Sequence, residues 1–267
     1  MISLSVAVLV CRFLPIVTRL DIGHHDRVGG KGQIGVVKGQ EEISNPRNRL
    51  ANRITLWGRK SSVNVQSVLW CLEELGLAYS RIDAGFTYGV VTTPAYLEMN
   101  PNGKVPVLID GDGPAIFEAG AILRYLATQY ASAPFWPDTP AARAVVDKWA
   151  EWAKINFANY FISDVFWPLV RIPPSQRDFS AIRAALASIE KELAVANKIL
   201  ATHHYLAGDD FSLADIQLGH CLYRYYDIDV ARADLPHLRA YYGRLAKRRG
   251  FINHVMVSYG ELRVTKG

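Results

Sequence analysis

The chain has 267 residues, of which half are hydrophobic and 21% are charged, and its net charge is +5. This is ordinary globular composition, with enough apolar surface for the core of one large domain or two modest ones. The basic residues are scattered, which argues against nucleic-acid binding. The one tight cluster, at 247–249, falls at an expected helix end, where cations complement the carbonyl end of the helix dipole.

The cysteines are three in number and far apart, at Cys11, Cys71 and Cys221. They form no CxxC pair, which argues against a disulfide framework, a structural zinc site and a dithiol redox motif. No segment approaches the roughly 18–20 apolar residues that span a bilayer. Residues 2–10 are apolar but lack the flanking features of a secretory signal. We therefore expect a cytoplasmic protein with no metal and no membrane partner.

Residues 1–52 differ from the rest of the chain. After an apolar start, residues 23–39 are rich in glycine, histidine and basic residues and show no sustained periodicity. We expect an N-terminal extension that is poorly ordered or loosely packed, or that reflects a misassigned start codon.

Regular structure is expected from Arg53 to residue 131. Gly76 is placed to close the first helix of this region. The expected elements, in chain order, are a strand at 54–57, a helix at 64–75, a strand at 79–82, a short helix at 93–99, strands at 105–109 and 115–117 joined by a tight turn, and a helix at 118–130. This β-α-β-α-β-β-α order predicts a small mixed α/β sheet with helices on both faces.

Residues 132–140 contain three prolines and are expected to form a linker. The remaining residues, 141–267, require no strand. Helices are expected at 141–170, 181–201, 213–226 and 235–247, which predicts an all-α helical bundle as the second domain.

The first informative motif is the junction of strand and helix at 57–66. A helix N-terminus offers free N–H groups and a partial positive charge. A thiolate placed there would have a lowered pKa, and the hydroxyl of Ser62 could donate a hydrogen bond to it. Alternatively, Ser62 is only the N-cap of this helix.

The second motif is Asn-Pro-Asn-Gly-Lys-Val-Pro at 100–106. Proline inside a strand removes a ladder donor. It is explained if the bond between Val105 and Pro106 is cis and if the backbone of Val105 pairs with an extended peptide ligand. The alternative is an ordinary edge-strand proline.

Two further motifs lie at helix starts. Glu118 precedes a helix whose N-terminus can receive a carboxylate, while its own side chain can meet an ammonium group. Alternatively, it only complements the helix dipole. Ser212 and Asp215 have capping-box spacing, and we interpret them as structural.

Together, these motifs resemble the soluble glutathione transferase superfamily, over residues 53–251. The Trp-Gly-Arg start and the 100–106 motif look most like bacterial members, and the Ser62 region is similar to the serine-type theta and phi classes. The resemblance implies a thioredoxin-like N-terminal domain that binds glutathione, followed by the helical domain. It also implies a homodimer.

The resemblance also implies roles for particular residues. Ser62 matches the serine that activates the glutathione thiol, Ser61 is its competitor because the loop register is uncertain by one residue, and Asn64 would lie near the thiol. The expected glutathione-binding residues are Lys104 for the glycyl carboxylate, the backbone of Val105 for the cysteinyl unit, the cis-proline Pro106, and Glu118 with Ala119 at the γ-glutamyl end.

Position 119 departs from the family pattern, which has serine after the glutamate. The backbone N–H remains, but the hydroxyl that binds the γ-glutamyl carboxylate is missing. A hydrogen bond to a charged group contributes roughly 1.5–3 kcal/mol, or about 10- to 150-fold in affinity. The loop at 86–89 also departs, because similar bacterial chains have more glycine there.

The second substrate is expected between the two domains, because aromatic and polar residues on the helix after the linker have helical spacing. Those expected to line an apolar electrophile site are Trp149, Trp152, Asn156 and Phe157. The alternative for each of them is core packing.

The expected function is conjugation of the glutathione thiolate to a small hydrophobic electrophile, with glutathione as co-substrate and no metal. Two alternatives stay open: a glutathione-dependent reductase, peroxidase or dehalogenase on the same fold, and a binding protein that kept the fold and lost turnover.

Overall fold

The computed structural model describes residues 53–264, all of which belong to one compact unit of the chain. The expected N-terminal extension at 1–52 lies outside the described residues, as do residues 265–267.

The N-terminal half contains a four-stranded mixed sheet. Strand β1 (Ile54–Trp57) pairs in parallel with β2 (Tyr79–Ile82) and antiparallel with β3 (Val107–Asp110), which pairs antiparallel with β4 (Ile116–Phe117). The strand order is β2-β1-β3-β4. The helices are α1 (Val63–Glu74), α2 (Pro94–Met99) and α3 (Ala119–Tyr130). The expected β-α-β-α-β-β-α order and the thioredoxin-like arrangement are confirmed.

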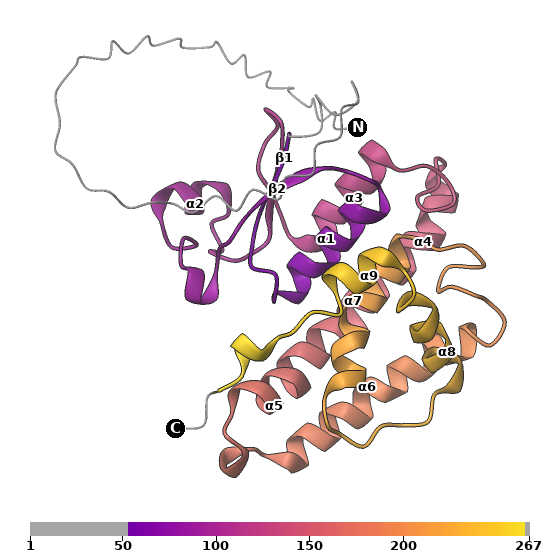
Figure 1. Cartoon of the computed structure of the whole chain (residues 1–267). Helices are drawn as coiled ribbons and strands as arrows, with labels where there is room; N and C mark the ends of the chain where they lie inside the picture. The colour runs from indigo at the N-terminus through magenta and orange to yellow at the C-terminus, as the bar shows by residue number, and fades with distance from the viewer. Residues whose placement is uncertain (1–52, 265–267) are drawn as a thin grey trace, which may run out of the picture. The chain divides into compact units, whose positions relative to one another are not determined.

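The two faces of this sheet have separate cores because side chains alternate along each strand. Leu56 and Leu108 join the large core that contains α1 and α3. Their neighbour Val107 faces the other way and packs in a small cluster with Tyr96 of α2. Figure 1 accordingly shows α2 on one side of the sheet and α1 and α3 on the other.

The C-terminal half is helical, as expected. Its main helices are α4 (Pro140–Trp152), α5 (Trp167–Arg171), α6 (Phe179–Ile199), α7 (Leu213–Asp227), α8 (Pro236–Leu245) and α9 (Arg249–His254). The single helix expected at 141–170 is instead α4 and α5 joined by two π-helical segments, Ala153–Ala158 and Phe161–Phe166. Helix α9 was not expected.

Pro168 gives a physical reason for the second π-helical segment. In a regular α-helix, its ring would clash with the carbonyl group of Asp164, and it has no N–H to donate to that carbonyl. The segment Phe161–Phe166 ends just before α5, whose first turn contains this proline. The wider i→i+5 turns therefore place the residues after Ala153 at angles that a continuous α-helix would not give.

The two halves share one core. Trp70 of α1 is fully buried, and its ring lies edge-on to Phe251 of α9, with ring centroids 5.0 Å apart. Arg248 donates two hydrogen bonds, of 2.8 and 2.6 Å, to the carboxylate of Glu74 in α1, and Arg249 pairs with Glu73. The basic cluster at 247–249 thus joins the two halves. Our expectation that it only caps a helix was incomplete.

The turn before α7 is held by a buried carboxylate. Asp215 accepts hydrogen bonds from Leu206 N, Ser212 N and the Tyr241 hydroxyl at 2.8–2.9 Å, and from the Ser212 hydroxyl at 3.1 Å. The capping box is present, so the structural interpretation of these residues agrees with the geometry.

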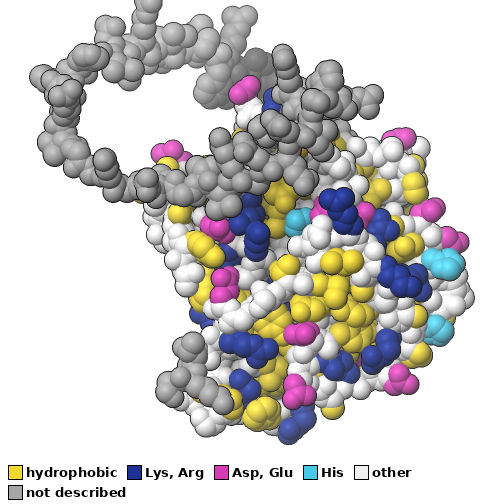
Figure 2. Space-filling view, viewed as in Figure 1, with side chains coloured by type: hydrophobic (Ala, Val, Ile, Leu, Met, Phe, Trp, Pro, Cys, Tyr) yellow, Lys and Arg dark blue, Asp and Glu magenta, His cyan; other side chains and the backbone are white. Residues whose placement is uncertain are grey.

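None of the described helices is long and apolar enough to cross a membrane. On the face shown in Figure 2, lysine and arginine side chains alternate with acidic and hydrophobic ones instead of forming one patch. Within residues 53–264, no group of three His, Cys, Asp or Glu side chains could hold a metal ion.

A candidate glutathione cleft between the sheet and the helices

A cleft of about 570 Å³ lies between the two halves of the described chain. Its sheet side consists of the N-terminus of α1, the loop before β3 and the first residue of α3. Its helical side consists of the π-helical region and one face of α7. The residues from the sheet side that line it are Arg59, Ser61, Ser62, Val63, Asn64, Gly85, Phe86, Val91, Gly103, Lys104, Val105 and Ala119.

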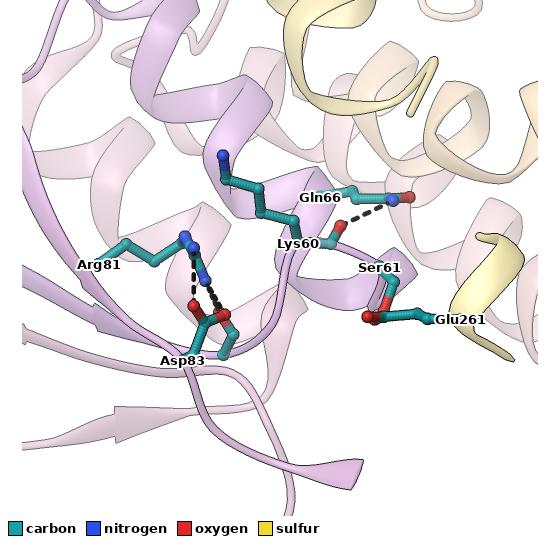
Figure 3. A network of polar contacts seen from close by, with 7 residues as sticks. Lys60, Ser61, Gln66, Arg81, Asp83 and Glu261 are labelled. Carbon is teal, nitrogen blue, oxygen red and sulfur yellow. Dashed lines mark hydrogen bonds and ion pairs between the residues drawn. The ribbon is translucent and has the colours of Figure 1, made fainter. Parts of the chain in front are cut away.

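Ser61 and Ser62 both line this cleft, but their hydroxyl groups differ. Ser61 donates a hydrogen bond to the carboxylate of Glu261, which Figure 3 shows reaching it from the C-terminal segment. Ser62 occupies the N-cap position of α1, yet its side chain makes no capping bond. No hydrogen bond joins its hydroxyl to another described residue, so this group is free to meet a ligand at the helix N-terminus. Asn64 is exposed at the same end of α1 and also lines the cleft.

The loop before β3 presents backbone groups to the cleft. The bond between Val105 and Pro106 is cis, as expected. Pro106 is buried and comes directly before β3, so it removes no donor from within the strand. The backbone N–H and C=O of Val105 have no hydrogen-bond partner within residues 53–264. Lys104 is exposed at the lining, and its carbonyl accepts from Tyr96 and Asn100, which fixes the loop.

The start of α3 holds Glu118 in an unusual conformation. Glu118 has φ +68°, a left-handed value that costs a non-glycine residue free energy and clusters at functional sites. Its exposed carboxylate pairs with Lys154 Nζ at 3.2 Å, across to the helical half. The next residue, Ala119, is buried and lines the cleft. The helix N-terminus here therefore faces the cleft without a side-chain cap.

The helical wall of the cleft differs from the expected electrophile site. It is lined by Lys154, Ala158, Asn159, Ile162, Ser163 and Trp167, together with Gln217, His220 and Arg224 of α7. None of the four residues expected at this wall lies in it. Trp149 packs edge-on against Trp152, and both are half-buried against the core. Phe157 is stacked on Phe161 with no exposed surface, and Asn156 donates a hydrogen bond to Glu192. The residues that do line this wall, at 154, 158 and 162, follow one another at intervals of four and come from the π-helical region after α4, whereas Trp149 and Trp152 lie within α4.

Burial sets the protonation of the titratable groups on the α7 face. Burial lowers the pKa of His220 to about 4, so this imidazole is neutral near pH 7. Burial also lowers the pKa of Arg224 to about 10, which leaves the guanidinium charged. Its Nη2 donates a hydrogen bond of 2.5 Å to the carbonyl of Ser61. Sequence reasoning missed both residues, although their spacing along α7 places them on one face.

The cysteines in the described chain take no part in the cleft. Cys71 and Cys221 are free and fully buried, and burial raises the pKa of each thiol. Neither lines the cleft. Cys11 lies outside the described residues.

The arrangement defines a class of protein, in which a thioredoxin-like half with a cis-proline loop faces a helical half across a ligand-sized cleft. Comparison with known families agrees. The model described as "Glutathione S-transferase, N-terminal domain" matches residues 52–128, and "Glutathione S-transferase, C-terminal domain" matches residues 158–249. The chain belongs to the glutathione S-transferase family.

Individual relatives support this assignment. Glutathione S-transferase GstB of Escherichia coli K12 is 38% identical over 205 residues, which cover 76% of this chain and 98% of that protein. The crystal structure of a theta class glutathione S-transferase from Xanthomonas axonopodis pv. citri, with glutathione bound, is 44% identical. It covers 78% of this chain and 99% of the other, with a TM-score of 0.73. Elongation factor 1-gamma of Prunus avium is 30% identical over 205 residues, or 74% of this chain and 47% of that protein.

Proposed function

We propose that the chain binds reduced glutathione in an extended form along the sheet side of the cleft and transfers its thiolate to a small electrophile. In this proposal, the free backbone groups of Val105 pair with the cysteinyl unit, Lys104 faces the glycyl carboxylate, and the N-terminus of α3 receives the γ-glutamyl carboxylate. The glutathione-bound relative, 44% identical over almost its whole length, supports this placement.

The observation that carries the proposal is the hydroxyl of Ser62. It stands at the N-terminus of α1 with no bond to another described residue, whereas the hydroxyl of Ser61 is bound to Glu261. Ser62 is therefore the proposed donor to the sulfur atom, and the free N–H groups of α1 add to stabilisation of the thiolate. The thiolate is the nucleophile, so no residue of the protein is covalently modified.

Ser62→Ala tests this role. We expect kcat to fall at least ~10-fold, while the Kd for glutathione changes little, because the lost hydrogen bond is to the reacting sulfur. The measurement is steady-state conjugation of chlorodinitrobenzene, with glutathione binding followed by calorimetry. Ser61→Ala is the matched control. An active Ser62→Ala enzyme beside an inactive Ser61→Ala enzyme would reverse the assignment.

The wall proposed for the electrophile is Ile162 with Trp167, because both are half-buried and line the cleft. Truncation of Trp167 to alanine is expected to lower kcat/KM for chlorodinitrobenzene ~10-fold or more through lost apolar contact. Trp149→Ala is the control, since this side chain does not line the cleft. A larger loss of kcat/KM in Trp149→Ala than in Trp167→Ala would place the electrophile site at the residues expected from the sequence.

A second candidate function is a binding protein without turnover. Ala119 favours it, because the hydroxyl that holds the γ-glutamyl carboxylate in the family is missing, and the match to an elongation factor subunit shows this region in a protein with another name. A glutathione affinity column separates the two functions: retention with conjugation supports the transferase, and no retention supports the binding protein.

Mixed-disulfide reductase chemistry is disfavoured, because no cysteine among the described residues lines the cleft.

We further propose a homodimer in which the sheet half of one subunit faces the helical half of the other. Exposed apolar side chains on the sheet half, among them Tyr88, Val90 and Leu97, support an interface there. Analytical ultracentrifugation at micromolar concentration tests the proposal, and a monomer across that range would contradict it.

A further inference from the structure

Three arginine side chains lie near one corner of the cleft, which Arg59 and Arg224 line and Arg171 does not. The guanidinium carbons of Arg59 and Arg171 lie 5.6 and 4.5 Å from the centroid of the same ring, that of Phe86, which lines the cleft. Arg224 reaches the same corner from α7 and donates a hydrogen bond to the carbonyl of Ser61. The three residues come from the loop after β1, the last residue of α5 and the second half of α7, so the fold brings them together from separate segments.

No carboxylate within residues 53–264 forms an ion pair with any of these three arginines. Arg224 is only 1% exposed, and its Nη1 has no hydrogen-bond partner; the same is true of the buried Nε of Arg59. Burial lowers the pKa of Arg59; the carboxylate of Glu261 opposes this shift, and the charge of Arg171 adds to it. Clustered, partly buried like charges destabilise a protein unless an anion compensates them.

The charged side chains that line the cleft are all cations. Lys154 is already paired with Glu118, and Lys104 lies at the loop proposed for glutathione, so Arg59 and Arg224 are the lining cations that remain without an ion-pair partner among the described residues. The carboxylate that raises the pKa of Arg59 belongs to Glu261, which is exposed, accepts a hydrogen bond from Ser61 (Figure 3) and does not line the cleft. A guanidinium group matches a carboxylate in both geometry and charge.

We propose that this arginine cluster binds a carboxylate, or an oxyanion of similar size, carried by the second substrate. The enzyme then prefers anionic electrophiles to neutral ones of the same shape. The inference rests on the proposed transferase function and names its substrate class. With a chloronitrobenzoate, the thiolate sulfur forms a bond to the ring carbon that bears chlorine, the C–Cl bond breaks, and chloride leaves with the bonding electron pair.

Turnover gives the first test. The paired substrates are 4-chloro-3-nitrobenzoate and 4-chloro-3-nitrobenzamide, and kcat/KM for each is divided by its uncatalysed rate with glutathione. We expect the benzoate to be favoured about 10-fold or more. Arg171→Gln, at an exposed position against Phe86, should reduce this preference measurably and leave the KM for glutathione unchanged. Arg183→Gln is the control, because it makes the same charge change on the exposed surface of α6.

Binding gives a second test that needs no turnover. Calorimetry with saturating glutathione compares the binding of the unreactive 3-nitrobenzoate and 3-nitrobenzamide. We expect the wild type and Arg183→Gln to bind the benzoate about 10-fold more tightly than the benzamide, and Arg171→Gln to show a measurably smaller preference. Equal affinities would overturn the anion site while leaving the transferase intact. A benzoate preference without conjugation of either chloro compound would instead reject the transferase and keep the site. If Arg171→Gln weakens glutathione alone, the cluster serves glutathione and the inference fails.

Discussion

The alanine at position 119 is expected to limit the affinity for glutathione, because its methyl side chain lacks the hydroxyl that serine would have there. Ala119 is 6% exposed, lines the cleft and is the first residue of α3. Ala119→Ser places a hydroxyl beside the free N–H groups at that helix end, where it can donate a hydrogen bond to a bound carboxylate. We expect the Kd for glutathione, measured by calorimetry, to fall about 10-fold.

The control for this change lies in the same turn of α3. Ala121 is exposed and does not line the cleft, so Ala121→Ser should leave the Kd unchanged. If both variants bind glutathione like the wild type, the γ-glutamyl carboxylate does not lie at the start of α3.

His220 is expected to make stability depend on pH. Its Nδ1 lies 3.1 Å from the carbonyl oxygen of Ile216, and burial lowers its pKa from 6.5 to about 4. Between these values, the unfolded chain binds a proton that the folded chain does not, so stability falls as the pH drops from 6.5 toward 4. The loss reaches about 3 kcal/mol at pH 4.

Urea unfolding at several pH values measures this effect in wild type and in His220→Asn, which keeps a donor for the Ile216 carbonyl. As the pH drops from 6.5 toward 4, the free energy of unfolding of the variant should fall less steeply than that of the wild type. Because all other titrating groups are common to both proteins, the difference between the two curves isolates His220. Parallel curves would show that this imidazole is not kept neutral by folding.

Helices α1 and α4 both have a hydroxyl residue at the N-cap position, and of these two hydroxyl groups only that of α4 caps its helix. Thr139 caps α4 by accepting a hydrogen bond from Ala142 N at 3.3 Å, whereas Ser62, at the same position of α1, makes no such bond. Thr139→Ala should therefore lower the free energy of unfolding by about 1 kcal/mol, and Ser62→Ala by clearly less. Urea denaturation of the two variants compares them. An equal loss would mean that Ser62 acts as an ordinary N-cap.

The position and type of most elements could be predicted because periodicity and capping residues report them locally. The helix expected at 64–75 is α1 (Val63–Glu74), with Gly76 following at φ +64°, and the short helix expected at 93–99 is α2 (Pro94–Met99). The π-helical turns could not be predicted, because a change in hydrogen-bond width leaves the apolar pattern of a helix nearly unaltered. The expected electrophile residues do not line the cleft, whereas Ile162, in the second π-helical segment, does.

For the whole described unit, the sequence motifs identified one side of the cleft and not the other. Short-range patterns led to Ser62 and Val105, and the family resemblance led to Ala119; all three line the cleft. Arg59, Arg171 and Arg224 are separated by 112 and 53 residues along the chain, and only packing of the two halves brings them together. The same packing joins the halves through Trp70, which makes them one structural unit.

Gly219 of α7 allows this close packing to be tested. A methyl group there would lie 2.7 Å from Leu245 Cδ1 and 2.8 Å from the buried ring of Trp70 in α1. Overpacking costs about 1–3 kcal/mol, while alanine favours a helix by up to ~1 kcal/mol. With a helix gain of ~1 kcal/mol, Gly219→Ala should therefore show a net loss of up to about 2 kcal/mol of stability. Gly243→Ala, in the exposed surface of α8 with nothing within 4 Å, should gain up to ~1 kcal/mol.

Native-state hydrogen exchange shows whether both halves share the loss of stability caused by Gly219→Ala. Because Trp70 belongs to the sheet half and Gly219 to the helical half, one cooperative unit would lower the protection of β1 and of α6 by the same free energy. A loss confined to α6 would mean that the halves open separately. In that case, a cleft lined by both would not be preformed for its ligand, and binding would have to supply the free energy that closes it.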